Sequence, residues 1–310
     1  MTKPRIAVIG AGPWGKKIIG TLTRMASAQL VAVVSSNTGI QSQLPANCRI
    51  IADWRSLVDD KMADGVVIAA PPALHAEMAV SLIGAGRSVL IEKPMCLSAA
   101  EAERIVAIAE KAKSVVQVNH IDLQNAAWKA LCGHLPAIGP IRTVTGVIGE
   151  FNDGPENRRP HWVYGPHFIA CCVRLMGRPP EHVTARRVEK INHRGIELRA
   201  GKTAVEIEMR FESAGARIVL GDGFDEKVRT MTVSGEDGEL TYDDTQSQKL
   251  FFSDRNRNRT ALDCAGSSPL ENALNRFVAA IQNGNPDCSD ALLGRRVIEV
   301  LCRCDQDLSI

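Results

Sequence analysis

Along the first 120 residues, short runs of apolar residues alternate with segments in which apolar positions recur at helical spacing. Apolar runs of this length predict buried strands, and the spaced segments predict helices. The runs are residues 5–9, 30–34, 65–70, 88–91 and 115–118. Helices are expected at about 14–26, 75–85 and after Ser98, which forms a capping box with Glu101. Apolar strands separated by helices indicate a parallel sheet that is covered on both faces.

After about residue 140 the pattern changes to short strands, and residues 205–211 alternate strictly between apolar and polar. Strict alternation predicts one buried and one wet face, as in an antiparallel sheet. The expected strands are residues 142–149, 182–188, 196–199, 204–211, 217–220, 228–233 and 240–242. Helices are expected at 167–176, 269–282 and 289–301. The chain is therefore expected to be an α/β protein with two domains, residues 1–121 and 122–310.

Composition narrows the class of protein. The 310 residues suit two domains, and 45% hydrophobic with 23% charged residues is ordinary for a globular protein. A formal net charge of +2 argues against a nucleic-acid partner, and no apolar run is long enough to span a membrane. The N-terminal segment lacks the features of a signal peptide. Nine dispersed cysteines form no CxxC pair and no zinc spacing, so we expect reduced thiols, no metal site and a cytoplasmic protein.

A glycine-rich loop follows the first expected strand and opens the first expected helix. Gly10, Gly12 and Gly15 have the GxGxxG spacing, with Pro13 and Trp14 between the last two glycines. In such a loop the first glycine allows a tight turn, the second lets a pyrophosphate approach the backbone, and the third lets helix and strand pack closely. The helix N-terminus then offers N–H groups to the phosphates. The loop predicts a dinucleotide-binding Rossmann domain.

The end of the second expected strand bears on the choice of dinucleotide. An acidic residue there would hold the ribose hydroxyls of NAD, but no Asp or Glu precedes Asp53. The strand is followed by Ser35, Ser36 and Asn37, whose small polar side chains tolerate a 2′-phosphate. Positive charge nearby, from residues such as Lys16, points the same way. These residues favour NADP over NAD, and no arginine stands in the expected place to settle the choice.

Further motifs, together with the glycine loop, carry a resemblance to a known family. They are Ala70-Pro71-Pro72 followed by His75, Glu92-Lys93-Pro94, and Gly165-Pro166-His167. The chain resembles the Gfo/Idh/MocA oxidoreductases over nearly its whole length. The resemblance implies an N-terminal Rossmann domain and a C-terminal α+β domain with a large, mostly antiparallel open sheet. It also implies a homodimer or homotetramer, and hydride transfer between NAD(P) and a hydroxyl-bearing carbon of a sugar-like or nucleotide-sugar substrate.

The same resemblance implies site residues. Lys93 matches the active-site lysine, whose ammonium can stabilise a developing alkoxide or relay its proton. His167 matches the active-site histidine, a natural proton carrier near neutral pH. The peptide bond between Lys93 and Pro94 is expected to be cis. Residues expected to contact the cofactor beside the glycine loop and Ser35–Asn37 are Ala70, Pro71, Pro72, His75, Glu92, Lys93 and Pro94.

The sequence departs from the family pattern where two carboxylates are expected. Val163 stands where the family usually has an aspartate four residues before the histidine, and Phe168 replaces a second acid. One interpretation is a rearranged catalytic set of Lys93, His167 and Tyr164. Asp122 or His120 would then supply a replacement polar group. The residues expected to contact the substrate are His120, Asp122, Arg158, His161 and Trp162.

The missing carboxylates leave other functions open. The first hypothesis is an NAD(P)-dependent oxidoreductase acting on a sugar-like or nucleotide-sugar compound. The second is a non-catalytic dinucleotide-binding regulator, for which a repressor with this family's fold is a precedent. The third is a reductase of an imine or unsaturated substrate, which needs a hydride donor and one proton donor but no aspartate to hold a sugar hydroxyl.

Overall fold

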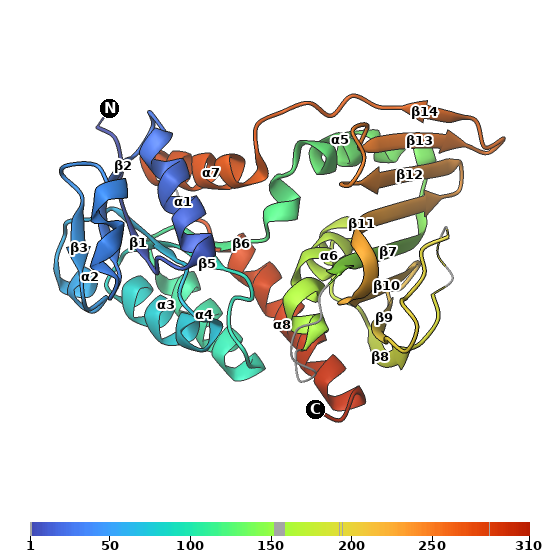
Figure 1. Ribbon diagram of the computed structural model, residues 1–310, viewed down its shortest axis with the longest axis horizontal. Helices are drawn as coiled ribbons and strands as arrows, with labels where there is room; N and C mark the ends of the chain where they lie inside the picture. The colour runs from blue at the N-terminus through green and yellow to red at the C-terminus, as the bar shows by residue number, and fades with distance from the viewer. Residues whose placement is uncertain (1, 152–158, 192, 194, 285) are drawn as a thin grey trace. The chain divides into compact units, whose positions relative to one another are not determined.

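The computed structural model describes residues 2–151, 159–191, 193, 195–284 and 286–310 (Figure 1). The chain divides into two compact units. The first comprises Met1–Ile121 and Ser268–Ile298, and the second comprises Asp122–Ser267 and Glu299–Ile310. Residues 268–298, which the expected division at residue 121 places in the second domain, thus belong to the first unit.

The first unit is built on a six-stranded parallel sheet with the strand order β3-β2-β1-β4-β5-β6. Its strands are β1 (Arg5–Ile9), β2 (Gln29–Val34), β3 (Arg49–Ile51), β4 (Gly65–Ile68), β5 (Ser88–Glu92) and β6 (Val116–Asn119). Its helices are α1 (Pro13–Arg24), η1 (Thr38–Gln43), α2 (Ser56–Asp59), η2 (Pro72–Leu74), α3 (His75–Gly84), α4 (Ala99–Lys111) and α7 (Pro269–Asn283). Helices α1 and α7 cover one face of the sheet, and α3 and α4 cover the other (Figure 1). This is the expected doubly wound Rossmann architecture.

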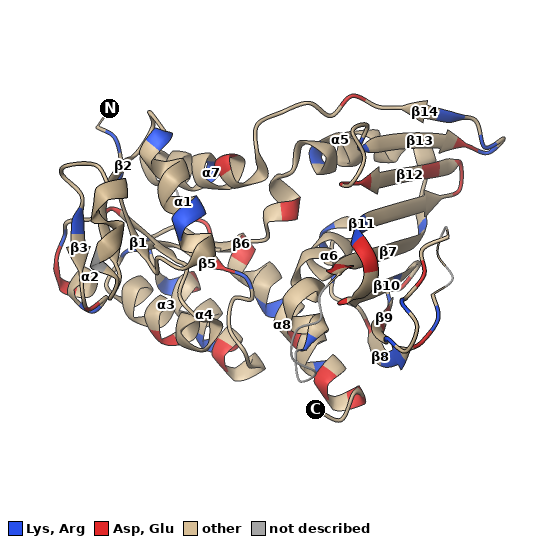
Figure 2. Cartoon of the chain, viewed as in Figure 1, with Lys and Arg blue, Asp and Glu red and all other residues tan. Residues whose placement is uncertain are grey.

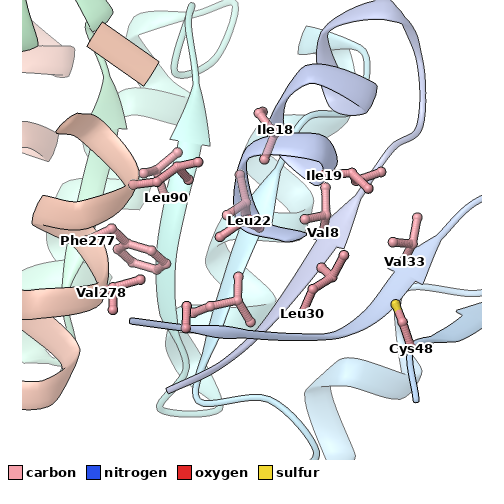
Figure 3. Close-up of a cluster of buried hydrophobic side chains, with 14 of the residues drawn as sticks. Val8, Ile18, Ile19, Leu22, Leu30, Val33, Cys48, Leu90, Phe277 and Val278 are labelled. Atoms are coloured by element: carbon pink, nitrogen blue, oxygen red, sulfur yellow. The ribbon is translucent and has the colours of Figure 1, made fainter. Parts of the chain in front are cut away.

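The core on the α1 side of the sheet shows why residues 268–298 belong here. Phe277 and Val278 of α7 are buried against the same apolar cluster as Leu22 of α1 and Leu90 of β5 (Figure 3). Phe277 is fully buried. Burying a side chain of that size stabilises the fold by about 1.5–3 kcal/mol. The apolar stripe of α7 therefore completes a core that the first 121 residues leave open.

The second unit contains an eight-stranded sheet with the order β14-β13-β12-β11-β7-β10-β9-β8. Neighbouring strands are antiparallel except β7 and β10, which are parallel. The strands are β7 (Ile141–Phe151), β8 (His182–Val188), β9 (Ala204–Arg210), β10 (Gly215–Gly221), β11 (Gly223–Gly235), β12 (Gly238–Asp243), β13 (Leu250–Asp254) and β14 (Arg259–Ala261). The helices are η3 (Ile121–Gln124), α5 (Ala126–His134), η4 (Leu135–Ile138) and α6 (Pro160–Met176), which packs on β7, β9 and β10. Helix α8 (Ser289–Asp307) contributes its last residues.

Several elements of the second unit differ from the sequence-based expectation. Residues 196–199 form no strand, and Ile196 makes only an isolated bridge to His193. Helix α6 begins at Pro160 rather than at His167, because Pro160 fits the first turn of a helix, where no N–H is needed. It continues through Pro166. Strands β13 and β14, over Leu250–Asp254 and Arg259–Ala261, are additional to the expected strands.

The polar face of the alternating strand β9 is also not fully exposed to solvent. Glu206 is only 4% exposed, although the alternation places it on the polar side. Its carboxylate pairs with Arg186 on β8 and with Arg217 on β10, where the Nη1–Oε2 distance is 3.2 Å. Two long arginine side chains from the neighbouring strands thus cover a carboxylate that periodicity alone would place in water.

Charged residues of both signs are interspersed along the helices and strands of both units (Figure 2). All nine cysteines are free thiols. Within the part of the chain that the structure describes, no helix combines the length and apolar character needed to cross a bilayer.

Candidate functional site

The glycine loop of the first unit contains two glycines that the fold itself requires. Gly10 has φ +102°, and a Cβ atom there would lie 2.4 Å from the carbonyl oxygen of Ala69. A Cβ atom on Gly15 would lie 2.2 Å from the carbonyl oxygen of Gly10. Larger residues at either position would force β1, β4 and α1 apart. These two positions explain the loop's shape without reference to any ligand.

Gly12, between them, is different. Its φ of −67° suits any residue, and a Cβ atom there would meet no atom within 4 Å among the described residues. Gly12 is also the N-cap of α1, and no side chain caps this helix terminus. The fold therefore does not require a glycine here. A glycine that keeps this position open beside bare helical N–H groups fits the approach of a pyrophosphate.

Substitutions at Gly12 and Gly15 should separate ligand binding from folding. We expect Gly12→Ala to weaken NADPH binding by about tenfold or more, a loss of about 1.4 kcal/mol, because a methyl group fills the open position. Gly12→Ala should change the free energy of unfolding by at most about 1 kcal/mol. Gly15→Ala should instead destabilise the protein by about 1–3 kcal/mol through overpacking. Fluorescence titration and urea denaturation measure the two effects. Unchanged binding of NADPH by Gly12→Ala would show that the open position at Gly12 does not receive the pyrophosphate.

The turn after β2 is shaped by its own side chains. The backbone N–H of Asn37 donates to Ser35 Oγ at 3.0 Å, and Asn37 Oδ1 accepts from the N–H of Gly39 at 2.9 Å. Ser36 is exposed. Of the three residues predicted to contact the adenosine ribose, two thus maintain the turn and Ser36 presents its hydroxyl to solvent.

Glu92 joins the glycine loop to the ends of β5 and β6. Its Oε1 accepts from Trp14 Nε1 at 2.6 Å and from Asn119 Nδ2 at 2.7 Å, while Oε2 accepts from the backbone N–H of Lys93 at 3.3 Å. Burial raises the pKa of Glu92, against the effect of these hydrogen bonds. The indole N–H of Trp14 is therefore engaged within the protein. Glu92 fixes the backbone from which the Lys93 side chain projects.

His75 joins the two other predicted cofactor-binding segments. Its Nδ1 lies 2.9 Å from the carbonyl oxygen of Pro94, and its Nε2 lies 2.8 Å from that of Ala70. Burial, the largest influence, lowers the pKa of His75, and the two carbonyl groups oppose it. The peptide bond between Lys93 and Pro94 is cis, as expected. His75 thus holds the turn after β4 against the turn that carries Lys93.

In the second unit, His167 lies within a buried ionic cluster. Its Nδ1 is 2.5 Å from Asp122 Oδ2. Arg229 of β11 donates from Nη2 to Asp122 Oδ1 at 2.5 Å and to Oδ2 at 2.6 Å, and from Nε to Oδ1 at 3.0 Å. Burial acts to raise the pKa of Asp122, but the charges of His167 and Arg229 outweigh it, so the pKa lies well below its usual range. Asp122 is an ionised group that orders the histidine.

Tyr164, a predicted catalytic residue, is engaged elsewhere. Its hydroxyl lies 2.5 Å from Asp222 Oδ1 and 3.0 Å from Glu150 Oε1. Burial and the two carboxylates raise its pKa far above the ordinary value. Such a hydroxyl keeps its proton at neutral pH. The contacts therefore give no support to acid–base chemistry at Tyr164, which instead ties α6 to β7 and to the turn after β10.

The predicted substrate residues His161 and Trp162 are both bound to Asp305 of α8. His161 Nε2 lies 2.7 Å from Asp305 Oδ1, and Trp162 Nε1 donates to both carboxylate oxygens at 3.1 Å. His161 is fully buried, and burial lowers its pKa against the pull of Asp305. These contacts are structural: they attach the start of α6 to the C-terminal helix. Arg158 lies outside the described residues.

Removing the Asp305 carboxylate should therefore affect stability. We expect Asp305→Ala to lower the free energy of unfolding by about 2–4 kcal/mol, because two buried donors lose their shared acceptor. Thermal or urea unfolding followed by circular dichroism measures this. Asp225→Ala, which removes an exposed carboxylate of β11, is the matched control and should change stability by less than about 1 kcal/mol. A loss for Asp305→Ala as small as the control would show that the contacts contribute little.

Two residues remain to be placed: His120, which was predicted to contact the substrate, and Arg229, which was not predicted. His120 follows β6 in the first unit and is buried, and its backbone N–H donates to the carbonyl of Val118 at 2.8 Å. Arg229 was not anticipated from the sequence. It is 107 residues from Asp122, and no local pattern distinguishes it from the other basic residues of the second unit.

Comparison with known proteins agrees with the Rossmann fold of the first unit. The Gfo/Idh/MocA model, described as an oxidoreductase family with an NAD-binding Rossmann fold, matches residues 4–120. A solved structure of a putative oxidoreductase from Magnetospirillum magnetotacticum MS-1 is 35% identical and superposes with a TM-score of 0.85, covering 98% of this chain and 100% of that chain.

Two of the curated relatives each match about half of this chain. The dTDP-3,4-didehydro-2,6-dideoxy-alpha-D-glucose 3-reductase of Saccharopolyspora spinosa is 26% identical over 155 residues, 48% of this chain and 47% of the relative. The scyllo-inositol 2-dehydrogenase (NADP(+)) IolU of Bacillus subtilis is 31% identical over 154 residues, 48% of this chain and 46% of the relative. The chain thus spans about half the length of the curated relatives it matches. From its motifs, its two units and its match to a solved oxidoreductase along the whole chain, this protein belongs to the Gfo/Idh/MocA oxidoreductase family.

Proposed function

We propose that this protein is an NADP-preferring oxidoreductase that transfers a hydride between the nicotinamide and a hydroxyl- or carbonyl-bearing carbon of a sugar-like or nucleotide-sugar substrate. The observation that carries the proposal is Gly12, which keeps an open position at the N-terminus of α1 that the fold does not need. When bound, the nicotinamide dinucleotide supplies or accepts the hydride. The chain's own residues then have to bind, orient and move a proton.

In this proposal, Lys93 and His167 handle the charge and the proton of the substrate hydroxyl. The Lys93 ammonium stabilises negative charge on the substrate oxygen, and Glu92 holds the backbone beside it. His167, held at Nδ1 by Asp122, takes the hydroxyl proton in oxidation and returns it in reduction. Val163 provides no carboxylate for the substrate, so this set differs from the family pattern at that position.

The preference for NADP rests on the turn after β2. No acidic side chain stands at Ser35–Asn37 to repel a 2′-phosphate, and Ser36 offers an exposed hydroxyl. The printed name of the Bacillus subtilis relative includes NADP(+). The sugar-like substrate class is supported by the names of both curated relatives, one a deoxysugar reductase and the other an inositol dehydrogenase.

Direct binding and turnover test the proposal. Tryptophan fluorescence gives the dissociation constants of NADPH and NADH, with Gly12→Ala as the binding-deficient control. We expect NADPH to bind at least about tenfold more tightly. Absorbance at 340 nm then follows a panel of sugars, inositols and nucleotide-sugars in both directions. No binding of either dinucleotide would overturn the proposal, and tight binding with no turnover on any panel member would favour a non-catalytic dinucleotide-binding protein.

A further inference from the structure

We propose that Asp122 and Arg229 are positioning residues for His167, and that they replace the carboxylate missing at position 163. Asp122 accepts a hydrogen bond from the Nδ1–H group of His167, and Arg229 holds Asp122 in place. The kinetic part of this inference rests on the proposed function, whereas the structural part concerns the state of the His167 ring and stands by itself.

The three residues come from distant parts of the second unit. Asp122 is in η3, His167 is in the middle of α6, and Arg229 is on β11. Arg229 contacts both oxygens of Asp122 through Nη2, and His167 Nδ1 contacts Oδ2. Asp122 and His167 are 6% and 9% exposed. Side chains so buried, and so multiply bonded, have one orientation each.

The contact defines the tautomer of His167. The pKa of Asp122 lies well below its usual range, so the group is a carboxylate that can only accept hydrogen bonds. Nδ1 must therefore carry a proton in the neutral ring. The lone pair of the neutral ring is then at Nε2, which becomes the nitrogen that exchanges a proton. A carboxylate at position 163, one helical turn before His167, would be a different route to an oriented ring.

Arg229 adds a second effect through its charge. A carboxylate facing an imidazole favours the protonated ring, but a guanidinium on the same carboxylate cancels most of that attraction. The pair of Asp122 and Arg229 is close to neutral as a unit. Arg229 therefore limits how strongly the carboxylate favours a proton on the ring, which suits a group that must alternate between base and acid.

Other titratable groups surround the pair. Cys171 of α6, Cys132 of α5 and Tyr242 of β12 all have raised pKa values, chiefly because of burial, and are neutral at neutral pH. Asp244, which follows β12, is ionised and paired with Lys249 at 2.7 Å and with Lys227 at 3.5 Å. Of these groups, Asp244 is the charged one, and its two lysine partners offset its charge.

The alternative is that Asp122 and Arg229 simply cross-link the unit. Under either function the two charges act on the pKa of His167, but only a positioning function links them to kcat. Asp122→Asn leaves the Arg229 cation without its partner, so the pKa of His167 should fall. Arg229→Met leaves the Asp122 anion without its partner, so the pKa of His167 should rise. A mere cross-link predicts the same charge-driven displacements and a loss of stability, but a folded Asp122→Asn protein with the wild-type kcat.

Nuclear magnetic resonance of protein labelled with nitrogen-15 at histidine tests this without any substrate. His167→Asn identifies the His167 signals. We expect the wild-type neutral ring to be protonated at Nδ1, the pKa to fall by about one unit or more in Asp122→Asn, and to rise by about one unit or more in Arg229→Met. Arg229→Lys, which keeps the charge, should return the pKa most of the way. Neutral rings protonated at Nε2, or displacements in the same direction, would overturn the inference.

Kinetics provide the second readout. In Asp122→Asn we expect kcat to fall about 10²-fold with little change in KM, because the ring loses its fixed tautomer. The limb of the pH profile that belongs to His167 should move in opposite directions in the two variants. The control is Asp290→Asn, which removes another buried carboxylate paired with an arginine, Arg276, at 2.7 Å. It should lose stability and keep the wild-type pH profile.

The two readouts separate failure of this inference from failure of the proposed function. Suppose that the wild-type protein shows no turnover, but that its His167 has the expected tautomer and the two variants displace its pKa in opposite directions. The oxidoreductase proposal would then be wrong, and the positioning role of Asp122 and Arg229 would stand. Turnover that persists in Asp122→Asn with an unchanged pH profile would remove the positioning pair and keep the oxidoreductase.

Discussion

Replacing Lys93 with methionine is expected to lower kcat by about 10²- to 10⁴-fold, which is the usual effect of losing a positioned proton-transfer or charge-stabilising group. Methionine keeps the length and apolar stem of lysine and removes the ammonium. NADPH binding should change by less than about threefold, because the pyrophosphate is held at the N-terminus of α1 rather than by Lys93. Steady-state kinetics and fluorescence titration on the same preparation measure both quantities.

The matched control for this variant is Lys111→Met. Lys111 is an exposed residue in the last turn of α4, so its loss removes one charge and one favourable helix-end contact only. Its kcat should remain within about twofold of the wild-type value. Equal small effects for the two lysines would remove Lys93 from the catalytic set. A large loss of NADPH affinity in Lys93→Met alone would assign Lys93 to cofactor binding instead of proton chemistry.

Replacing His167 with asparagine is expected to have a comparable effect on kcat, about 10²- to 10⁴-fold. The asparagine amide can still donate to Asp122, as the Nδ1–H of the ring does, so the cluster with Arg229 keeps its hydrogen bonds. The asparagine side chain has no group at the position of Nε2 of the histidine ring. The variant therefore separates the histidine's proton-carrying nitrogen from its structural contact, and its pH profile should lose the limb near neutrality.

The control for His167→Asn is His134→Asn, at the exposed end of α5, where Nδ1 contacts the carbonyl of Ala130 at 2.8 Å. We expect kcat within about twofold of the wild-type value and an unchanged pH profile. Unfolding curves of both variants show whether they are folded. A folded His167→Asn protein with the wild-type kcat would contradict the role of His167.

The sequence and the structure agree best where local chemistry decides. Short apolar runs separated by helices are sufficient to predict a parallel sheet, because only strands buried on both faces have that pattern. Gly15 follows from the same local logic, since it lies close to the carbonyl group of Gly10, five residues earlier. Ser98 caps α4 as expected, with the N–H of Glu101 donating to Ser98 Oγ at 3.2 Å, whereas the Glu101 carboxylate accepts from the N–H of Leu97 at 3.1 Å. These features require information from only a few neighbouring residues.

Agreement is poorer where a contact joins distant segments. The sequence predicts substrate contacts for His161 and Trp162 because they precede His167, and it gives no sign that both bind Asp305, more than a hundred residues further along. Glu206 was expected on a wet face, and arginines from two neighbouring strands cover it. No periodicity encodes these partners, because sheet order and helix packing bring them together only after the chain has folded.

By itself, then, the sequence determined the class of the fold and the glycine loop, and it singled out Lys93 and His167 as candidate catalytic residues, since each depends on a short motif or a local period. Only the tertiary structure decided that residues 268–298 complete the first unit, that Tyr164 is held between two carboxylates, and that Asp122 and Arg229 form the cluster at His167. The physical reason is common to all three. A buried charge or apolar stripe is stable only beside its partner, and that partner is selected by packing in three dimensions rather than by proximity along the chain.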